Sequence, residues 1–348
     1  HYDGMKRYVA YLRSTATNDI VNHGLGDWYD LGPKPPGFSQ LTPIALVSTA
    51  FYYYDTHLLS RIAALLGRPG EARRFGRQAA QIRAAFNGKF FDPARRDYAT
   101  GSQTANAMPL VMGLVAPSNR ASVLQAIVRD VGSRDDALTS GDVGYRYLLQ
   151  ALATHGNHVR LQLGFDGSGH YVMRLLPEGG RSDMIFAMNN QTNKPGYGYQ
   201  LARGATSLTE SWNARRGSSQ DHFMLGQIQE WFYRDLAGIQ DAPGSPGFKH
   251  IIIRPQPAGD LRWVKASYNS IRGSIVSDWR ISLGRFRLRV EIPANTAATV
   301  YVPATSAGAV TESGRPAAKS PGIKFLRMSR GYAVFAVASG RYDFQSRF

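Results

Sequence analysis

The stretch APGSPG at residues 242–247 separates two kinds of sequence pattern. Proline and glycine at this density end helices and mark a boundary. Before the stretch, apolar residues recur every three or four positions, which is typical of amphipathic helices. After it, RFRLRVEI at 285–292 alternates polar and apolar residues strictly, as a half-buried strand does. We therefore predict a helical domain over residues 1–241 and a β domain over residues 242–348.

The helical pattern is organised in pairs joined by short connections, which favours antiparallel helical hairpins. Successive hairpins without intervening strands favour an α/α toroid, in which the helix ends and their loops form a central pocket. One exception is predicted, a β-hairpin around the turn FDGSGHY within residues 159–174. The predicted helices span residues 3–16, 42–66, 69–86, 103–114, 117–131, 143–154 and 181–189.

Short strand patterns follow one another throughout the C-terminal part, separated by turn residues. About seven such strands in a chain segment of this length predict an antiparallel β-sandwich. The predicted strands span residues 250–254, 263–268, 274–281, 285–292, 299–302, 323–328 and 331–337.

The amino-acid composition limits the classes of function and partner that the chain can have. The 348 residues hold 41 Lys+Arg against 25 Asp+Glu, a net charge of +16. The basic residues are dispersed along the strands, so we predict a solvated basic surface, suited to an acidic polysaccharide or cell surface, and no nucleic-acid partner. The absence of cysteine excludes disulfides and thiol chemistry. No 18-residue apolar run exists, so no membrane insertion is expected. The chain starts without Met or a leader pattern and is expected to be a mature or truncated piece.

Residues 204–239, GATSLTESWNARRGSSQDHFMLGQIQEWFYRDLAGI, hold the first candidate site. A loop carries Glu210 beside Trp212, and a helix is predicted from residue 221 with His222 in its first turn and Ser218 or Ser219 as its N-cap. A carboxylate for proton transfer and an aromatic platform are typical of sugar-cleaving sites. Read alone, the same residues also fit a loop glutamate, a core tryptophan and a helix-start histidine.

A second candidate is the long loop at residues 18–40, which holds GLGDWYD at 24–30. Loops of this length inside a domain are usually functional or disordered. Asp27 is predicted to accept hydrogen bonds from sugar hydroxyls, with Trp28 beside it; the alternative is a tryptophan that plugs the end of a helical bundle. Tyr199, in the glycine–tyrosine turn at 193–199, is predicted to line the sugar pocket or to pack the loop.

Several motifs occur in one order along nearly the whole chain. They are GLGDWYD (24–30), AAFNGKFFD (84–92), TSGDVGYRYLLQAL (139–152), GYGYQLARGATSLTESW (196–212), DHFMLGQIQEWFYRDLAGI (221–239) and PGFKHIIIRPQ (246–256). This ordered set resembles the C-terminal part of the bacterial α-L-rhamnosidases of glycoside hydrolase family 78.

The resemblance implies an (α/α)6-toroid catalytic domain, with its N-terminal part missing, followed by an antiparallel β-sandwich. It implies inverting hydrolysis of terminal α-L-rhamnosides, with Glu210 as the general base. His222, Asp27 and Trp28 are implied near the sugar, and Trp212 and Tyr199 are further predicted substrate contacts. The expected partner is a rhamnose-containing oligosaccharide, polysaccharide or glycoside, in the periplasm or outside the cell, with the cytoplasm as the alternative. No cofactor and no metal site are predicted.

The sequence departs from the family pattern in three places. The segment that carries the family's general acid is absent, so the chain is expected to be inactive by itself. Thr209 replaces the aromatic residue before the base, and Asp221 replaces the asparagine before the histidine. Two alternatives stay open: a polysaccharide lyase or other hydrolase on the same toroid, and a non-catalytic carbohydrate-binding remnant.

Overall fold

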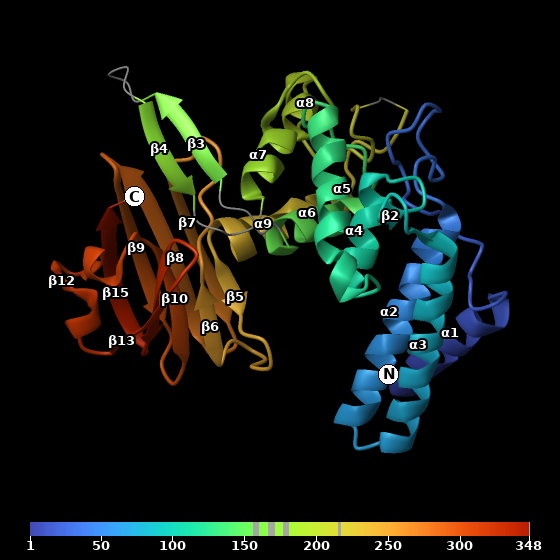
Figure 1. The fold of residues 1–348 in the computed structure, drawn as a ribbon, viewed down its shortest axis with the longest axis horizontal. Coiled ribbons are helices and arrows are strands. Elements are labelled where there is room, and N and C mark those ends of the chain that lie inside the picture. The colour runs from blue at the N-terminus through green and yellow to red at the C-terminus, as the bar shows by residue number, and fades with distance from the viewer. Residues whose placement is uncertain (156–159, 166–170, 177–180, 215–216, 348) are drawn as a thin grey trace. The chain divides into compact units, whose positions relative to one another are not determined.

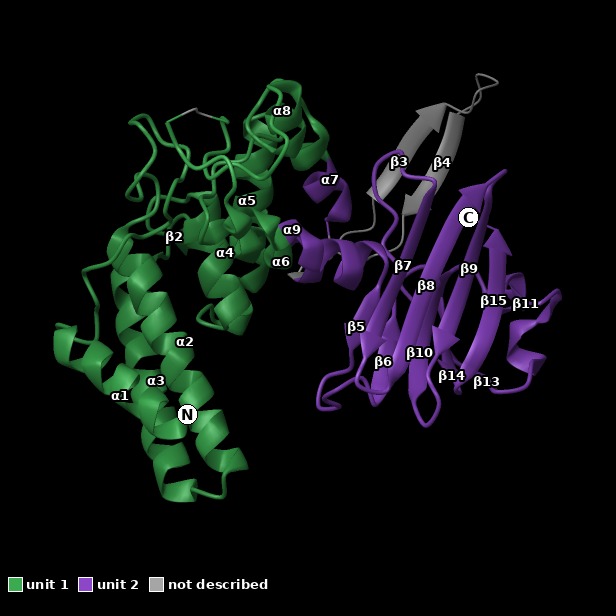
Figure 2. Cartoon of the chain, turned by 180° about the vertical axis from the view of Figure 1, so that it is seen from behind, with its two compact units in different colours: residues 1–151, 187–227 green, residues 152–186, 228–348 purple. Residues whose placement is uncertain are grey.

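The computed structural model describes residues 1–155, 160–165, 171–176, 181–214 and 217–347 (Figure 1). They form two compact units, one of residues 1–151 with 187–227 and one of residues 152–186 with 228–348 (Figure 2). By this division residues 152–186 and 228–241 group with the strands. The domain boundary drawn from composition at 241/242 stays a prediction.

Helices dominate the first unit, and the predicted ones are confirmed with small shifts at their ends. They are α1 (Tyr2–Thr15), α2 (Ile44–Leu65), α3 (Pro69–Phe90), α4 (Gln103–Met112), α5 (Arg120–Ser133, after a 3-10 turn at Pro117–Asn119), α6 (Gly144–His155), α7 (Ser182–Asn190) and α8 (Tyr197–Ala202). Two short strands, β1 (Phe91–Asp92) and β2 (Asp97–Tyr98), follow α3. By the contact division, the last residues of α6 and the first of α7 belong to the second unit.

The hairpin of α2 and α3 shows how the sequence sets these boundaries. Gly67 has a φ of +69°, a left-handed conformation that glycine adopts without a steric penalty, and it follows the end of α2. Pro69 then occupies the first position of α3, where its missing N–H costs no hydrogen bond. Inside the hairpin, Gln78 Nε2 donates to Tyr52 Oη at 2.9 Å, so that both buried polar groups are paired.

The long loop between α1 and α2 is ordered around Asp30. Its carboxylate accepts hydrogen bonds from the backbone N–H of Gln40 at 2.9 Å and of Leu41 at 2.7 Å, and from Ser39 Oγ at 3.2 Å. Gly26 has a φ of +72°, and a Cβ there would lie 2.4 Å from Cβ of Ser39. The loop therefore closes on itself and holds Asp27 and Trp28 in fixed places.

The second unit contains a β-sandwich. Its strands are β5 (Ile239–Asp241), β6 (His250–Ile253), β7 (Trp263–Ser270), β8 (Gly273–Ser282), β9 (Arg285–Ile292), β10 (Ala297–Pro303), β11 (Thr311–Glu312), β12 (Arg315–Pro316), β13 (Ile323–Ser329), β14 (Tyr332–Val337) and β15 (Gly340–Arg347). One sheet has the order β13-β14-β10-β6-β5 and the other β12-β11-β15-β9-β8-β7. All seven predicted strands are present, and β9 buries its apolar residues and exposes its arginines as predicted.

Two features of the sandwich differ from the prediction. The pair β6–β10 is parallel, so the first sheet is not wholly antiparallel. Strand β15 was not predicted, because GRYDFQSR holds only two large apolar residues, Tyr342 and Phe344; it nevertheless pairs with β9 along its whole length. Ser346 Oγ of β15 donates to the carbonyl of Pro303 at the end of β10 at 2.6 Å, which links the two sheets.

The predicted β-hairpin is also confirmed, as β3 (Arg160–Phe165) and β4 (Tyr171–Leu176), while residues 166–170 of its turn lie outside the described residues.

Residues 221–236 do not form the single helix that their spacing predicts. They form a 3-10 turn (Phe223–Gln227), one turn of α-helix (α9, Ile228–Trp231) and a π-helical turn (Phe232–Leu236). Phe223, an apolar residue that a helix of this spacing would bury, is 82 % exposed. The predicted N-cap, Ser218 or Ser219, has no α-helix directly after it to cap, because the 3-10 turn begins at Phe223 and α9 at Ile228.

Candidate active site

Three titratable side chains from separate segments of the first unit converge. Asp142 lies just before α6, Glu210 lies in the loop after α8, and His222 lies just before the 3-10 turn. Each offers a ligand-type atom, and these atoms all lie within 4.8 Å of one another. The sequence predicted Glu210 and His222 as site residues but not Asp142.

Glu210 is held by a local pairing of two loop segments. Its backbone N–H donates to the carbonyl of Ser219 at 2.9 Å, and the N–H of His222 donates to the carbonyl of Leu208 at 2.8 Å. Its carboxylate accepts from the N–H of Ser219 at 3.1 Å through Oε2 and from Trp28 Nε1 at 3.3 Å through Oε1. The side chain is 17 % exposed, so the carboxylate is oriented by two donors and still open to solvent.

Trp28 is half-buried, and its ring is packed against Tyr29 and Phe38 at centroid distances of 5.3 and 5.5 Å. Its carbonyl accepts from the N–H of Asp142 at 2.7 Å. A Cβ at Gly141 would lie 2.1 Å from that carbonyl oxygen, so this approach requires glycine. The indole N–H is thereby fixed toward Glu210.

Asp27 is fully buried, and the structure gives it a structural role in place of the predicted sugar contact. Its carboxylate accepts from Thr104 Oγ1 at 2.5 Å, from the N–H of Gly141 at 2.9 Å and from the N–H of Gly144 at 2.7 Å. Burial raises the pKa of Asp27 to about 6, against the opposing effect of these hydrogen bonds. Asp27 therefore joins its own loop to α4 and to the start of α6.

The prediction of Trp212 as a sugar platform is also corrected. Its side chain is fully buried, with Nε1 donating to the carbonyl of Ser140 at 2.9 Å. Its ring makes edge contacts with Tyr145 and Tyr197 at centroid distances of 4.8 and 5.1 Å. Trp212 therefore stabilises the loop that carries Glu210, and it has no surface to offer a ligand.

Tyr199 is half-buried in α8, and the guanidinium of Arg203 lies over its ring at 3.7 Å. Among the described residues, no hydrogen bond, ion pair or ring contact joins it to Glu210, Asp142 or His222. Its assignment to the sugar pocket stays a prediction.

Asp142 is the site residue that the sequence analysis missed. Its side chain is 3 % exposed, and both carboxylate oxygens are buried without a hydrogen-bond partner. Burial raises the pKa of Asp142 to about 7, with further contributions from the charges of Glu210 and Asp27. The available signal was its place in TSGDVG, between two glycines whose N–H groups bind Asp27.

His222 lies between the two carboxyl groups. Its Nδ1 is 3.8 Å from Oδ2 of Asp142, and its Nε2 is 4.0 Å from Oε1 of Glu210. A carboxylate–imidazole set of this kind can hold a divalent cation. The two ring nitrogens face different carboxyl groups, and one ligand-type atom from each of the three residues lies within 4.8 Å of the others. The absence of a metal site stays a prediction.

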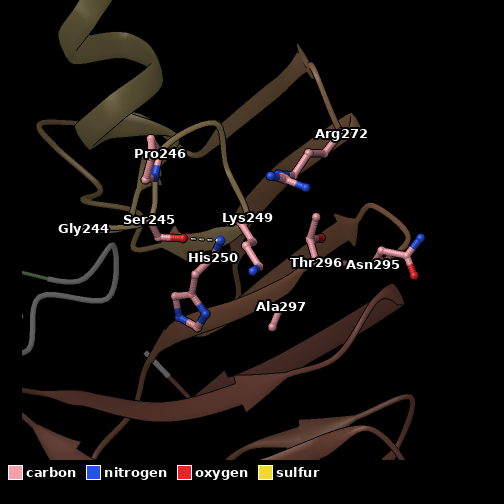
Figure 3. A pocket seen from close by; sticks show the side chains of 9 residues that line it. All are labelled: Gly244, Ser245, Pro246, Lys249, His250, Arg272, Asn295, Thr296 and Ala297. Carbon is pink, nitrogen blue, oxygen red and sulfur yellow. Dashed lines mark hydrogen bonds between the residues drawn. The ribbon is translucent and has the colours of Figure 1, made fainter. Parts of the chain in front are cut away.

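A separate pocket lies in the second unit and shares no residue with this cluster (Figure 3). It has a volume of about 790 Å³, and its charged lining residues are Lys249 and Arg272. Ser245 Oγ accepts from the N–H of His250 at 2.9 Å at its edge. The lining is basic and exposed and holds no carboxylate, so it offers no acid–base pair for glycoside hydrolysis.

Comparison with known protein families decides the relationship. The bacterial α-L-rhamnosidase six-hairpin glycosidase domain matches residues 1–163 and 156–236, which is more than half of the chain. The chain belongs to the bacterial α-L-rhamnosidase family. The C-terminal domain of the same family matches residues 238–316. The resemblance stated from the motifs is therefore confirmed, as is the helical domain followed by a β-sandwich.

Three similar rhamnosidases are much longer than this chain. An α-L-rhamnosidase of Formosa agariphila is 24 % identical over 359 aligned positions, which cover 100 % of this chain and 36 % of the relative. The solved structure of the Dictyoglomus thermophilum α-L-rhamnosidase is 30 % identical with a TM-score of 0.84, covering 100 % of this chain and 37 % of that one. The Streptomyces avermitilis α-L-rhamnosidase, solved with L-rhamnose, is 25 % identical with a TM-score of 0.82 over 99 % of this chain and 30 % of that one. The chain thus spans about a third of the length of these relatives.

Among the described helices, none has the length and apolar character to cross a membrane.

Proposed function

We propose that this chain provides the general base of an inverting α-L-rhamnosidase, and that Glu210 is that base. The observation that carries the proposal is the placement of the Glu210 carboxylate, which is partly open to solvent and oriented by the indole of Trp28 and the backbone of Ser219. In an inverting glycosidase such a carboxylate removes a proton from water as the water attacks the anomeric carbon. The family relationship and the rhamnose complex of the Streptomyces avermitilis relative support terminal α-L-rhamnose as the sugar.

The reaction also needs a general acid that protonates the departing glycosidic oxygen. In inverting enzymes the two carboxyl groups are about 6.5–9.5 Å apart, which leaves room for the water. Asp142 does not fit this role, because its ligand oxygen lies within 4.8 Å of that of Glu210 and its side chain is buried. We place the acid in the part of the longer relatives that this chain does not match, and we expect this chain alone to be inactive.

The proposed substrate is a rhamnose-containing oligosaccharide, polysaccharide or plant or bacterial glycoside. Such compounds are commonly met outside the cytoplasm, which supports a periplasmic or secreted site of action. The dispersed positive charge of the C-terminal part, with 16 Lys+Arg against 5 Asp+Glu in residues 242–348, suits an acidic glycan.

The test is release of L-rhamnose from an aryl α-L-rhamnoside by the full-length protein, its Glu210→Gln variant and this chain alone. We expect Glu210→Gln to reduce turnover by several orders of magnitude with little loss of folding, because the base acts in the transition state. Asp260→Asn, at an exposed position of the second unit, is the matched control. Near-wild-type rates for Glu210→Gln would refute the base assignment. Turnover by this chain that Glu210→Gln abolishes would show that the acid lies within it.

A further inference from the structure

Three buried polar atoms next to the proposed base have no hydrogen-bond partner. They are the two carboxylate oxygens of Asp142 and the Nδ1 of His222. Buried polar groups in folded proteins are nearly always paired, since leaving one unpaired costs about 1–3 kcal/mol. Two of the three atoms lie close together, since Oδ2 of Asp142 is 3.8 Å from Nδ1 of His222. Each of these two atoms is therefore a candidate hydrogen-bond partner for the other.

The second ring nitrogen of His222 faces the proposed base, Glu210. While Nδ1 faces Asp142, Nε2 lies 4.0 Å from Oε1 of Glu210. Both contacts exceed the ~2.7–2.9 Å of a charge-assisted hydrogen bond by about 1 Å, so the ring must shift before either bond forms. Each ring nitrogen of His222 thus has a different carboxyl group as its candidate partner.

We infer that Asp142 is a positioning residue: it binds Nδ1 of His222 and thereby aims Nε2 of that ring at the carboxylate of Glu210. This inference rests on the proposed function of Glu210. A carboxyl group behind a histidine fixes the orientation and tautomer of the ring in hydrolytic triads and at metal sites, and the same physical effect applies here. Asp142 does not touch substrate, because its side chain is almost completely buried.

The protonation state of Asp142 and His222 decides whether Nε2 of His222 presents a hydrogen or a lone pair to Glu210. If Asp142 and His222 share one extra proton, either neutral Asp142 donates to Nδ1 or ionised Asp142 accepts from a protonated ring, and in both forms Nε2 carries a hydrogen for Glu210. When that proton is lost, ionised Asp142 holds the hydrogen on Nδ1, and Nε2 turns its lone pair toward Glu210. The pair therefore supports the base below the pH at which it loses its shared proton and ceases to do so above it.

The groups that act on Asp142 keep this proton near neutral pH. Burial, followed by the charges of Glu210 and Asp27, raises the pKa of Asp142 to about 7. The imidazole of His222 also faces Asp142, with Nδ1 3.8 Å from Oδ2. Asparagine at position 142 keeps the size of the side chain and can accept through its oxygen or donate through its amide N–H, but it has no proton that titrates in this pH range.

The first measurement does not depend on turnover. Ring-nitrogen NMR of ¹⁵N-histidine-labelled protein is followed from pH 5 to 9, with the His222 signals assigned by their loss in His222→Gln. We expect Asp142→Asn to change the tautomer and the titration of the His222 ring, and Asp260→Asn to leave both unchanged. Identical His222 titration in wild type and Asp142→Asn would overturn the inference, provided that thermal unfolding shows both to be folded. Stoichiometric Zn²⁺ binding at micromolar affinity that Asp142→Asn, Glu210→Gln and His222→Gln each abolish would also overturn it, in favour of a metal site.

The second measurement is a double-mutant cycle on rhamnose release by the full-length protein. If Asp142 acts through His222, then Asp142→Asn lowers kcat by about 10- to 100-fold with little change in KM, and it adds little to the loss caused by His222→Gln. The wild-type rate falls above neutral pH, and Asp142→Asn removes that limb. Fully additive losses would contradict the inference. Failure of the proposed function appears separately, as no rhamnose release by the wild type, while the NMR result stands.

Discussion

The indole Nε1 of Trp28 lies 3.3 Å from Oε1 of Glu210, although 182 positions separate them in the sequence. Two loops meet at this hydrogen bond, the one between α1 and α2 and the one after α8. Each loop is fixed by its own contacts, the first around Asp30 and the second through Ser219. Trp28 is therefore more than a candidate sugar platform, because its N–H also orients the proposed base.

Two substitutions separate these two roles of Trp28. Trp28→Phe keeps an aromatic ring and removes the N–H, so we expect kcat to fall about 10-fold or more, as loss of a hydrogen bond to a charged group costs about 1.5–3 kcal/mol. Trp28→Ala removes the ring as well, and we expect KM for an aryl α-L-rhamnoside to rise in addition. Steady-state kinetics of the full-length protein make the measurement.

Trp263→Phe is the matched control, since Trp263 is an exposed residue of β7. Its kinetics should equal those of the wild type. An unchanged KM in Trp28→Ala would assign Trp28 to packing alone, and an unchanged kcat in Trp28→Phe would show that the hydrogen bond to Glu210 does not matter in turnover.

Most of the secondary structure was predictable, because apolar periodicity and turn residues act locally. The pair α2–α3 follows from helical spacing with Gly67 and Pro69 between them, and β9 follows from strict alternation. The segment at 221–236 was predicted less well. Its apolar spacing is helical, yet its first turn is a 3-10 turn with Phe223 exposed, and no local rule distinguishes the two helix types there.

The site was predictable only in part, because burial is a property of the tertiary structure. Asp27 and Trp28 are neighbours in one motif, and nothing in that motif shows that Asp27 is fully buried while Trp28 reaches Glu210. Asp142 follows a serine and a glycine, as turn aspartates commonly do. Its lack of a hydrogen-bond partner results from the approach of three distant segments, which the sequence does not show.

Asp27 provides a test of its structural role. Asp27→Ala leaves Thr104 Oγ1 and the N–H groups of Gly141 and Gly144 without their buried acceptor. Thr104 Oγ1 still has Ser140 Oγ at 3.0 Å as a partner, so two N–H groups are left unpaired. At about 1–3 kcal/mol for each unpaired group, we expect the free energy of unfolding to fall by about 2 kcal/mol or more. Urea unfolding monitored by fluorescence measures the change, with Asp260→Ala as the exposed control. Unchanged stability with a raised KM would restore the predicted sugar contact.

For Trp212 we expect a loss of stability with unchanged substrate binding, whereas for Trp28 we expect changes in kcat and KM. Trp212→Phe removes the hydrogen bond to the carbonyl of Ser140 and part of the ring that packs between Tyr145 and Tyr197. We expect the free energy of unfolding to fall by about 1–3 kcal/mol, with KM for an aryl α-L-rhamnoside unchanged in the folded fraction. Calorimetry and kinetics on the same preparation test this. A large rise in KM with an unchanged Tm would show that the indole meets the substrate after all.

The raised pKa of Asp142 predicts a dependence of stability on pH. The folded state holds the proton to about pH 7, whereas the unfolded chain loses it near 3.8. Between these values the folded state binds more protons, so the free energy of unfolding falls as pH rises from about 4 to 7, by up to about 1.4 kcal/mol per pH unit for this group, and then levels off. Burial also raises the pKa values of Asp27 and Asp235 to about 6. These two groups therefore add to the fall in the free energy of unfolding between about pH 4 and 6. In Asp142→Asn the group no longer titrates, so this variant should gain stability relative to the wild type at pH 8, differ little at pH 4, and show a smaller slope throughout the range from pH 4 to 7. Urea unfolding of both proteins at each pH makes the comparison, and an equal slope in both would show that Asp142 ionises in the folded protein at its ordinary pKa.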